Sequence, residues 1–386
     1  MSRLSTKATL IAAVILSALA TTANYASAND SSLDNPAAAD DTTVNSAIKW
    51  LETQHSFGVI NEADGRVSCS MRMVNISDSA IAITDVRTSC GCTSVNYPHQ
   101  PIAPGDTAIF TVTYNPAGLP GDFIKDVNIR LSAEPRRTRI SIFGRVIATP
   151  TTVNQRFPLK AGSLGLKHSL MTFGKVERGT ANTLYLHGYN AGDAPLAITV
   201  DDASTGLAAE VVTDTVEPGA NCIIAVKVDS NQCPNNWGPT DFSFRVLAVP
   251  TITDTNTLAG VARVKVVANL YDNFSYATEE QLASSPILTL SEDKLDFGSL
   301  GSGSDIRDLV ITNDGHTPLS IHRIISDAPE AISISVDNAI LAPGQSILIE
   351  VSASIPENQE FLNATLTIYS NDMHNPMPTC RIVGTN

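Results

Sequence analysis

The sequence predicts an all-β protein of three tandem immunoglobulin-like antiparallel β-sandwich domains that follow a signal peptide. Three observations predict it: landmarks that recur three times at a spacing of about 115–125 residues, short runs that alternate apolar and polar residues, and Pro-Gly pairs between such runs. A single hydrophobic core stops growing at about 250–300 residues, so a chain of 386 residues is expected to hold several domains.

The repeats share four landmarks in a fixed order. Each repeat opens with a Phe-Gly pair, continues with an asparagine and an apolar residue, and then reaches a Pro-Gly pair. The Phe-Gly pairs are Phe57-Gly58, Phe173-Gly174 and Phe297-Gly298; the asparagines are Asn75, Asn190 and Asn313; the apolar residues are Ile81, Leu196 and Leu319; the Pro-Gly pairs are Pro104-Gly105, Pro218-Gly219 and Pro343-Gly344. Units of this length are whole domains, because solenoid repeats are about 20–50 residues long.

The runs between the landmarks have the period of β-strands. In the run from Thr107 to Tyr114, residues Ala108, Phe110 and Val112 alternate with polar or branched neighbours. Such alternation, bounded by Gly, Pro, Asn and Asp, indicates antiparallel strands with one buried face. The Pro-Gly pairs fit turns, since Pro presets φ and Gly accepts a positive φ. One short helical turn is expected at Glu279–Ala283, between the second and third repeats.

The N-terminus has the form of a secretory signal peptide. Arg3 and Lys7 precede the apolar run 9–20, and Ala26-Ser27-Ala28 supplies a small-residue cleavage site. We therefore expect a signal peptide over 1–28, a flexible leader over 29–46, and domains over 47–148, 164–272 and 286–386. The apolar run is too short to span a bilayer, so we expect export without membrane insertion, most simply to the periplasm, with the cell surface or the medium as alternatives.

The charge balance argues against two classes of partner. The formal net charge is −14, whereas proteins that bind nucleic acids or anionic lipids non-specifically need an excess of Lys and Arg. The 43% hydrophobic residues are enough for buried cores.

The first repeat carries a motif that the other two repeats lack. Ser89-Cys90-Gly91-Cys92-Thr93 stands before Pro104-Gly105, and Gly118-Leu119-Pro120-Gly121 follows it. In this order of motifs the chain resembles a family of uncharacterised envelope domains common in Bacteroidota, marked by a Ser-Cys-Gly-Cys-Thr signature. The resemblance covers about a quarter of the chain. It implies an immunoglobulin-like fold, similar to the abnormal-spindle, hydin and major sperm protein domains, and no particular activity.

Cys90 and Cys92 are the candidate thiol site, and three interpretations stay open. The first is a structural disulfide, for instance with Cys69, which sits on a predicted strand. The second is a thiolate site for Cu(I) or Zn(II), for instance with His99, although two thiolates alone are an incomplete zinc site. The third is a redox-active Cys90–Cys92 bond, which Gly91 would permit.

The remaining cysteines predict no chemistry. Cys222 and Cys233 lie on and just beyond one strand, too far apart to bond unless the loop folds back. Cys380 alternates with Ile382 and is expected in the core.

No motif predicts a catalytic residue or a cofactor site. The sequence holds no His-Glu-x-x-His, no nucleophile elbow and no P-loop. The Gly-rich stretch 298–303 lacks a following helix pattern, so it is expected to be a turn. Two inserted loops, 230–240 and 250–260, lie in the second repeat, and Trp237 in the first of them is a candidate partner contact, because Trp is enriched in binding hot spots.

These observations predict a non-enzymatic structural or protein-interaction module of the bacterial cell envelope that binds one or more envelope proteins through sheet edges or loops. The alternative is a thiol redox or copper and zinc handling protein that uses Cys90 and Cys92.

Overall fold

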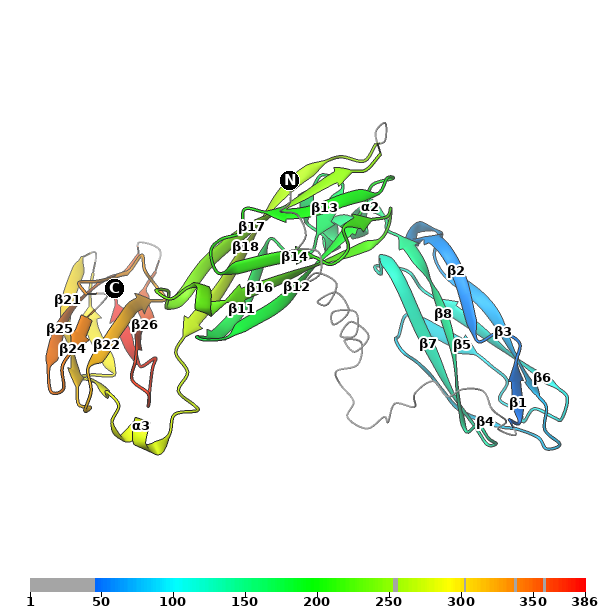
Figure 1. Ribbon diagram of the computed structural model, residues 1–386, viewed down its shortest axis with the longest axis horizontal. Coiled ribbons are helices and arrows are strands. Elements are labelled where there is room, and N and C mark those ends of the chain that lie inside the picture. Colours follow the sequence, from blue (N-terminus) through cyan, green and yellow to red (C-terminus); the bar gives the residue numbers. More distant parts are fainter. Residues whose placement is uncertain (1–45, 253–255, 302, 337–338, 357–358) are drawn as a thin grey trace, which may run out of the picture. The chain divides into compact units, whose positions relative to one another are not determined.

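The computed structural model describes residues 46–252, 256–301, 303–336, 339–356 and 359–386. The predicted signal peptide over 1–28 lies outside the described residues, and so does the predicted leader over 29–46 except for Ser46. The described chain is nearly all β, in six sheets that are mostly antiparallel, which confirms the predicted fold class (Figure 1). We call the strands β1–β8 unit one, β9–β18 unit two and β19–β27 unit three; the domain boundaries derived from the repeats remain predictions.

Unit one has two four-stranded sheets, in the orders β1-β3-β6-β5 and β2-β8-β7-β4. The strands are β1 (Ile48–Trp50), β2 (Gln54–Asn61), β3 (Val67–Asn75), β4 (Ile83–Thr88), β5 (Thr93–Asn96), β6 (Thr107–Tyr114), β7 (Gly121–Leu131) and β8 (Arg137–Ile147), with the 3-10 turn η1 (Glu62–Asp64) after β2. Ala108, Phe110 and Val112 all face the core, as the alternation predicts.

Unit two has two five-stranded sheets, β14-β16-β12-β10-β9 and β11-β18-β17-β13-β15. Its strands are β9 (Leu159–Ala161), β10 (Leu164–Leu166), β11 (Leu170–Glu177), β12 (Ala181–Asn190), β13 (Leu196–Asp201), β14 (Leu207–Val211), β15 (Thr215–Val216), β16 (Asn221–Asp229), β17 (Gly238–Pro250) and β18 (Gly260–Tyr271); the 3-10 turn η2 (Ser230–Gln232) follows β16.

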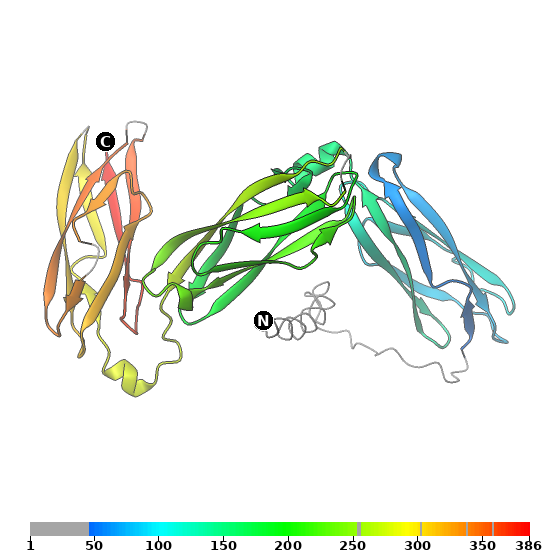
Figure 2. The same ribbon diagram turned by 45° about the horizontal axis from the view of Figure 1, so that its top comes forward.

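Unit three has sheets of four and five strands, β19-β21-β25-β23 and β20-β27-β26-β22-β24. Its strands are β19 (Leu288–Leu290), β20 (Lys294–Ser299), β21 (Ser304–Asn313), β22 (Leu319–Ser326), β23 (Ile332–Ile334), β24 (Ala339–Leu341), β25 (Ser346–Ser354), β26 (Phe361–Ser370) and β27 (Thr379–Thr385). In each unit the two sheets pack face to face around an apolar core (Figure 2).

The Phe-Gly landmark is a bulge in an edge strand that pairs in parallel. β2, β11 and β20 each run parallel to the last strand of their unit. The register of β2 shifts between Ser56 and Val59, and Gly58 between them has φ 62°. This left-handed conformation favours glycine. The repeated sequence sign therefore marks where each edge strand bends, and each unit contains one parallel pair that the alternation did not predict.

The asparagine, apolar and Pro-Gly landmarks form one buried corner in every unit. In unit one the side-chain amide of Asn75 donates to the carbonyl oxygens of Ser79 and Ile102, both at 2.8 Å. The backbone N–H of Gly105 donates to the carbonyl oxygen of Asn75 at 2.9 Å, and Ile81 is fully buried beside them. Asn190 and Asn313 are equally buried and make the same pattern of bonds. Buried amides need such partners, so the three landmarks recur together.

Two short helices connect the units. The expected turn at α3 (Glu279–Ala283) is present, with Thr278 and Gln281 forming a capping box. A second helix, α2 (Pro150–Arg156), was not predicted. Its signals are Thr149, whose hydroxyl accepts from the N–H of Thr152, and Pro150 in the first turn, both of which are typical of helix starts. None of the helices in the described part of the chain is long and apolar enough to span a bilayer.

Candidate functional site

The Cys90–Cys92 pair forms a disulfide bond in the connection between β4 and β5. This connection passes from one sheet of unit one to the other. Both cysteines are half-buried, and Gly91 between them is exposed with open space around it. The sulfur pair is therefore at the surface of the unit, where a second thiol could approach it.

Backbone hydrogen bonds fix this connection on both sides of the bond. The N–H of Thr93 and the hydroxyl of Thr88 donate to the carbonyl oxygen of Cys90, at 3.3 and 3.0 Å. The N–H of Asn115 donates to the carbonyl oxygen of Cys92 at 2.8 Å. The side chain of Thr93 points inward, 5% exposed, and its Oγ1 lies 3.6 Å from Sγ of Cys90 and 3.8 Å from Sγ of Cys92.

The structure does not bring Cys69 to the site, so the hypothesis of a structural bond to Cys69 is wrong. Cys69 is a free, buried thiol on β3, opposite Val112 of β6. β6 lies between β3 and β5 in the sheet. Two strand spacings of about 4.8 Å place Cys69 on β3 roughly 10 Å from β5, and Cys90 and Cys92 lie just before β5. A disulfide spans Cα atoms that are no more than roughly 7 Å apart. The bond connects Cys90 and Cys92 instead, which is the pairing named in the third interpretation; redox activity of this bond stays a proposal.

The four free cysteines are buried in apolar surroundings. Burial raises the pKa of the Cys69 thiol to about 11, with a further contribution from the charge of Glu52. Burial also raises the pKa of Cys222 to about 11, and it raises those of Cys233 and Cys380. Thiols are nucleophilic only as thiolates, so these four residues belong to the packing of the cores.

The described side chains give no support to the metal interpretation. Across the described ranges, no three or more His, Cys, Asp or Glu side chains are placed to hold one ion. The ring of His99, the proposed additional ligand, packs against Tyr97 with centroids 4.7 Å apart. Since a zinc site needs about four ligands, the arrangement of the described side chains does not supply one.

Trp237, the candidate partner contact, is half-buried and contacts other parts of the same chain. Its indole is stacked on the ring of His322 from unit three, with centroids 4.1 Å apart and planes at 9°. The guanidinium of Arg178 lies 4.3 Å from the indole centroid, a cation–π distance. The indole N–H donates to Asp272 at 3.2 Å. Trp237 is therefore half-buried among side chains of units two and three.

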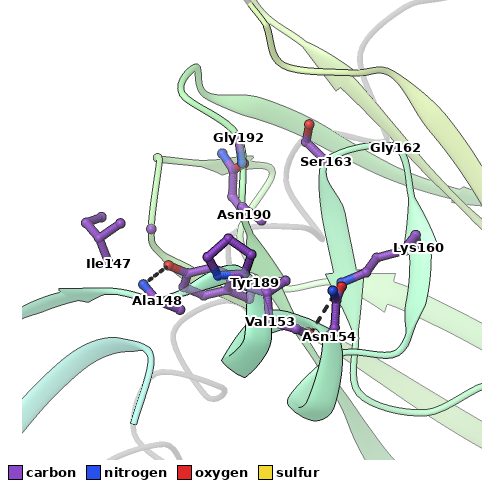
Figure 3. A pocket seen from close by; sticks show the side chains of 13 residues that line it. Ile147, Ala148, Val153, Asn154, Lys160, Gly162, Ser163, Tyr189, Asn190 and Gly192 are labelled. Carbon is purple, nitrogen blue, oxygen red and sulfur yellow. Dashed lines mark hydrogen bonds between the residues drawn. The ribbon is translucent and has the colours of Figure 1, made fainter. Parts of the chain in front are cut away.

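A hollow of about 300 Å³ lies where the end of β8 and helix α2 meet unit two. Figure 3 shows Tyr189, Val153, Asn154 and Lys160 around it. The Tyr189 hydroxyl accepts from the N–H of Ala148 at 2.9 Å, and the amine of Lys160 donates to the carbonyl of Val153. Burial lowers the pKa of Lys160.

Each unit also has a strand that is covered over only part of its length. β3 pairs with β6 from Val67 to Val74, but on its other edge β1 pairs with it only from Met73 to Asn75. The N–H of Leu51 adds one bond to the carbonyl of Arg72. Among the described residues no strand pairs with this edge between Val67 and Met71. We call this stretch the open edge of β3.

The open edge presents backbone groups that sequence reasoning did not assign to any residue. Because successive residues of a strand point their backbone groups to opposite edges, the bond to Arg72 places the N–H and C=O groups of Ser68 and Ser70 on the open edge. The side chains of Ser68, Ser70 and Arg72 are exposed on the outer face. No sequence signal indicated this edge, because it depends on how far β1 extends along β3.

Comparisons with known proteins bear on two parts of the chain. Residues 48–146 match the family model described as "Protein of unknown function (DUF1573)". Residues 286–385 match the model described as "HYDIN/CFA65/VesB-like, Ig-like domain". Among curated proteins, none matches the chain.

Among the solved structures that resemble part of the chain, three have the following identities, coverages and TM-scores. A protein of unknown function from Porphyromonas gingivalis is 19% identical, with 58% of this chain and 100% of that chain covered and a TM-score of 0.44. The YadV chaperone is 15% identical, with 57% of this chain and 99% of that chain covered and a TM-score of 0.24. SSP-19 of Caenorhabditis elegans, an MSP-domain protein, is 12% identical over 26% of this chain and 94% of that chain, with a TM-score of 0.21. By the two family models alone, the chain is similar over 48–146 to a domain family of unknown function and over 286–385 to a family of Ig-like domains.

Proposed function

We propose that the protein is an exported, non-enzymatic interaction module of the bacterial cell envelope, and that a partner protein adds a strand to the open edge of β3. An unpaired strand edge offers N–H and C=O groups that a partner strand can satisfy. The observation that carries the proposal is the missing neighbour of Val67–Met71 among the described residues. Export is supported by the signal-peptide pattern and by the disulfide of unit one, since disulfides persist outside the reducing cytosol.

The corresponding edge in unit three is less suited to a partner strand. β19 covers β21 only from Ile311 to Asn313, so the first half of β21 also lacks a strand neighbour in the described chain. There, however, the side chain of Asp305 accepts a hydrogen bond from the N–H of Ile306 at 2.9 Å. Charged residues that occupy an edge are a known protection against pairing. We therefore favour the edge in unit one over the edge in unit three.

The partner segment should be extended and of mixed polarity. On the outer face it would lie beside the hydroxyls of Ser68 and Ser70 and the guanidinium of Arg72, which favours polar residues and a carboxylate. On the inner face it would approach Val67 and Cys69, which favours apolar residues. Alternation along a strand gives this pattern at every second residue.

A proline substitution tests the edge. Ser70→Pro removes an N–H that points away from β6, so the pairing of β3 with β6 should survive. Affinity capture from an envelope fraction with the wild-type protein should retain a partner that Ser70→Pro loses and that Ser70→Ala, which keeps the N–H, retains. Ile306→Pro in unit three is the matched control and should retain it as well. Equal capture by Ser70→Pro would contradict the proposal.

We keep thiol redox chemistry at Cys90 and Cys92 as a second proposal, and with it copper and zinc handling by the reduced pair, which would need further ligands beyond the described side chains. The observation that favours its redox form is the bond between two half-buried cysteines next to the exposed Gly91. Because it closes a loop of only three residues, this bond stabilises the folded state by only about 1.6 kcal/mol through the entropy it removes from the unfolded chain. A bond to Cys69 would close a longer loop and give about twice that stabilisation. The bond is therefore a weak structural staple in an accessible place.

Thiol counting by mass spectrometry separates the forms of this second proposal. The mature protein is alkylated before and after treatment with millimolar dithiothreitol under native conditions, and bound copper and zinc are measured. Two additional alkylated cysteines, at Cys90 and Cys92, would support redox exchange, and stoichiometric metal would support metal handling. A bond that resists native reduction in a metal-free protein would eliminate both.

A further inference from the structure

We propose that Thr93 is a positioning residue for thiol–disulfide exchange at the Cys90–Cys92 bond, with a protein dithiol as the class of co-substrate. The inference rests on the redox form of the second proposed function and goes beyond it by naming the group that stabilises the leaving sulfur. The juxtaposition that carries it is the Thr93 hydroxyl beside both sulfurs, at 3.6 and 3.8 Å.

The Thr93 hydroxyl is the hydrogen-bond donor in this arrangement. A disulfide sulfur carries no proton, so the proton must come from the threonine. In the part of the chain that the structure describes, Oγ1 of Thr93 has the two sulfurs as its only hydrogen-bond partners. A buried hydroxyl normally has stronger partners. The hydroxyl is thus already placed to donate to either sulfur when that sulfur becomes a thiolate, which is a better acceptor.

The position of Thr93 is rigid. It begins β5 opposite Tyr114 of β6, and its N–H is bonded to the carbonyl oxygen of Cys90. Its β-branched side chain has few accessible rotamers in a strand. Tyr114, its cross-strand neighbour, is fully buried and stacked on Phe123 with centroids 4.1 Å apart. The core side of the hydroxyl is therefore buried, and in such surroundings a hydrogen bond to a charged acceptor is stronger than in water.

The exchange makes one sulfur a thiolate at this hydroxyl. A thiolate of the dithiol attacks one cysteine sulfur, the Cys90–Cys92 bond breaks, and the other sulfur leaves with the electron pair. The second thiol of the dithiol, once deprotonated, then attacks the mixed disulfide and releases the first cysteine. The dithiol is oxidised to a disulfide, and Cys90 and Cys92 gain two electrons and two protons in total. Because Oγ1 reaches both sulfurs, Thr93 can donate to whichever one leaves.

Two substitutions separate the hydroxyl from the shape of the side chain. Thr93→Val keeps the branched shape and the strand preference but removes the donor, whereas Thr93→Ser keeps the donor. Each full-length variant is equilibrated with mixtures of reduced and oxidised dithiothreitol under native conditions, and the fraction of reduced Cys90 and Cys92 is measured. The rate at which iodoacetamide alkylates the reduced pair at pH 7 is the second readout.

A hydrogen bond to a charged sulfur is expected to change both readouts about tenfold. In Thr93→Val, iodoacetamide should alkylate the reduced pair about ten times more slowly, and the equilibrium with dithiothreitol should shift toward the disulfide. Thr93→Ser should restore both values. If all three proteins exchange alike, Thr93 has no positioning role although the redox proposal stands. If the wild-type bond is not reduced under native conditions, the redox proposal and this inference both fall. Partner capture through Ser70 is independent of either result.

Discussion

The side-chain amide of Asn75 donates a hydrogen bond to the carbonyl oxygen of Ile102, 27 positions later, at 2.8 Å inside the core of unit one. The same amide also donates to Ser79, and its Oδ1 accepts from the N–H of Ser77. One side chain thus connects the end of β3, the following turn and the segment before the Pro-Gly turn. Asn190 and Asn313 make equivalent bonds in the other units.

Asn75→Ala should destabilise unit one by about 1–3 kcal/mol, because it removes the two hydrogen bonds that the buried amide donates to the carbonyl oxygens of Ser79 and Ile102. Asn128→Ala, on an exposed face of β7, is the control and should change stability by less than about 0.5 kcal/mol. Amide hydrogen exchange of peptides from β3 and β6, followed in increasing urea, measures the effect on this unit alone. Equal exchange in the two variants would exclude a structural role for the corner.

The bulge glycine of β2 provides a second test. Gly58 has a φ of 62° and no atom within 4 Å of an added Cβ. Gly58→Ala should therefore cost about 1–2 kcal/mol through backbone strain alone. Gly91→Ala adds a methyl group in equally open space without a positive φ and should be nearly neutral. The unfolding midpoints of the two variants measure the difference, and a cost shared by both would show that strain is not the cause.

Glu62 should make the free energy of unfolding of unit one depend on pH. Partial burial raises the pKa of its carboxyl, but hydrogen bonds from Gly118, Thr149 and Thr152 outweigh burial, and the pKa is lowered overall. The stabilisation from a lowered carboxyl pKa is present above the unfolded-state value, about 4.3, and is lost as the pH falls through the lower folded-state value.

Glu62→Gln should consequently reduce stability by about 1 kcal/mol at pH 7, and the difference from wild type should shrink as the pH falls below about 4. Urea midpoints at a series of pH values check this expectation. Glu210→Gln, on the exposed side of β14, should show no such trend. A constant difference between wild type and Glu62→Gln across the series would rule out the linkage.

Trp237 should limit exposure of the segment 273–285 between units two and three. Removing the indole by Trp237→Ala takes away its contacts with Arg178 and His322, so a protease should cut within 273–285 faster than in wild type. Leu258→Ala, at a side chain 65% exposed, should leave the rate unchanged. The time course of limited proteolysis, with fragments identified by mass, gives the answer; unaltered cleavage would mean that the stacking does not restrain the segment.

The sequence was sufficient for features that depend on local pattern. Alternation placed Phe110 and Val112 in the core, and the helical turn expected at Glu279–Ala283 is helix α3. The repeat landmarks could be found from the sequence, but their physical roles were visible only in the structure. Gly58 lies in a bulge of β2, and Asn75 holds a buried corner together by hydrogen bonds. Both roles depend on backbone conformations and partners that one-dimensional spacing does not contain.

What the sequence could not supply is the order of strands in a sheet. Cys69 was a reasonable partner for Cys90 or Cys92 until β6 was seen to lie between them. Trp237 seemed exposed because His322, its stacking partner, is 85 positions away in another unit. The open edge of β3 likewise depends on how far β1 reaches along it, which is a matter of register.

The most direct test of the account is site-specific photo-crosslinking at the open edge. A photoreactive amino acid at position 70 in the full-length exported protein is activated in living cells, with position 130 on the exposed face of β7 as the control. We expect a discrete adduct with an envelope protein from position 70 and none from position 130. No adduct at position 70, or equal adducts at both positions, would contradict it.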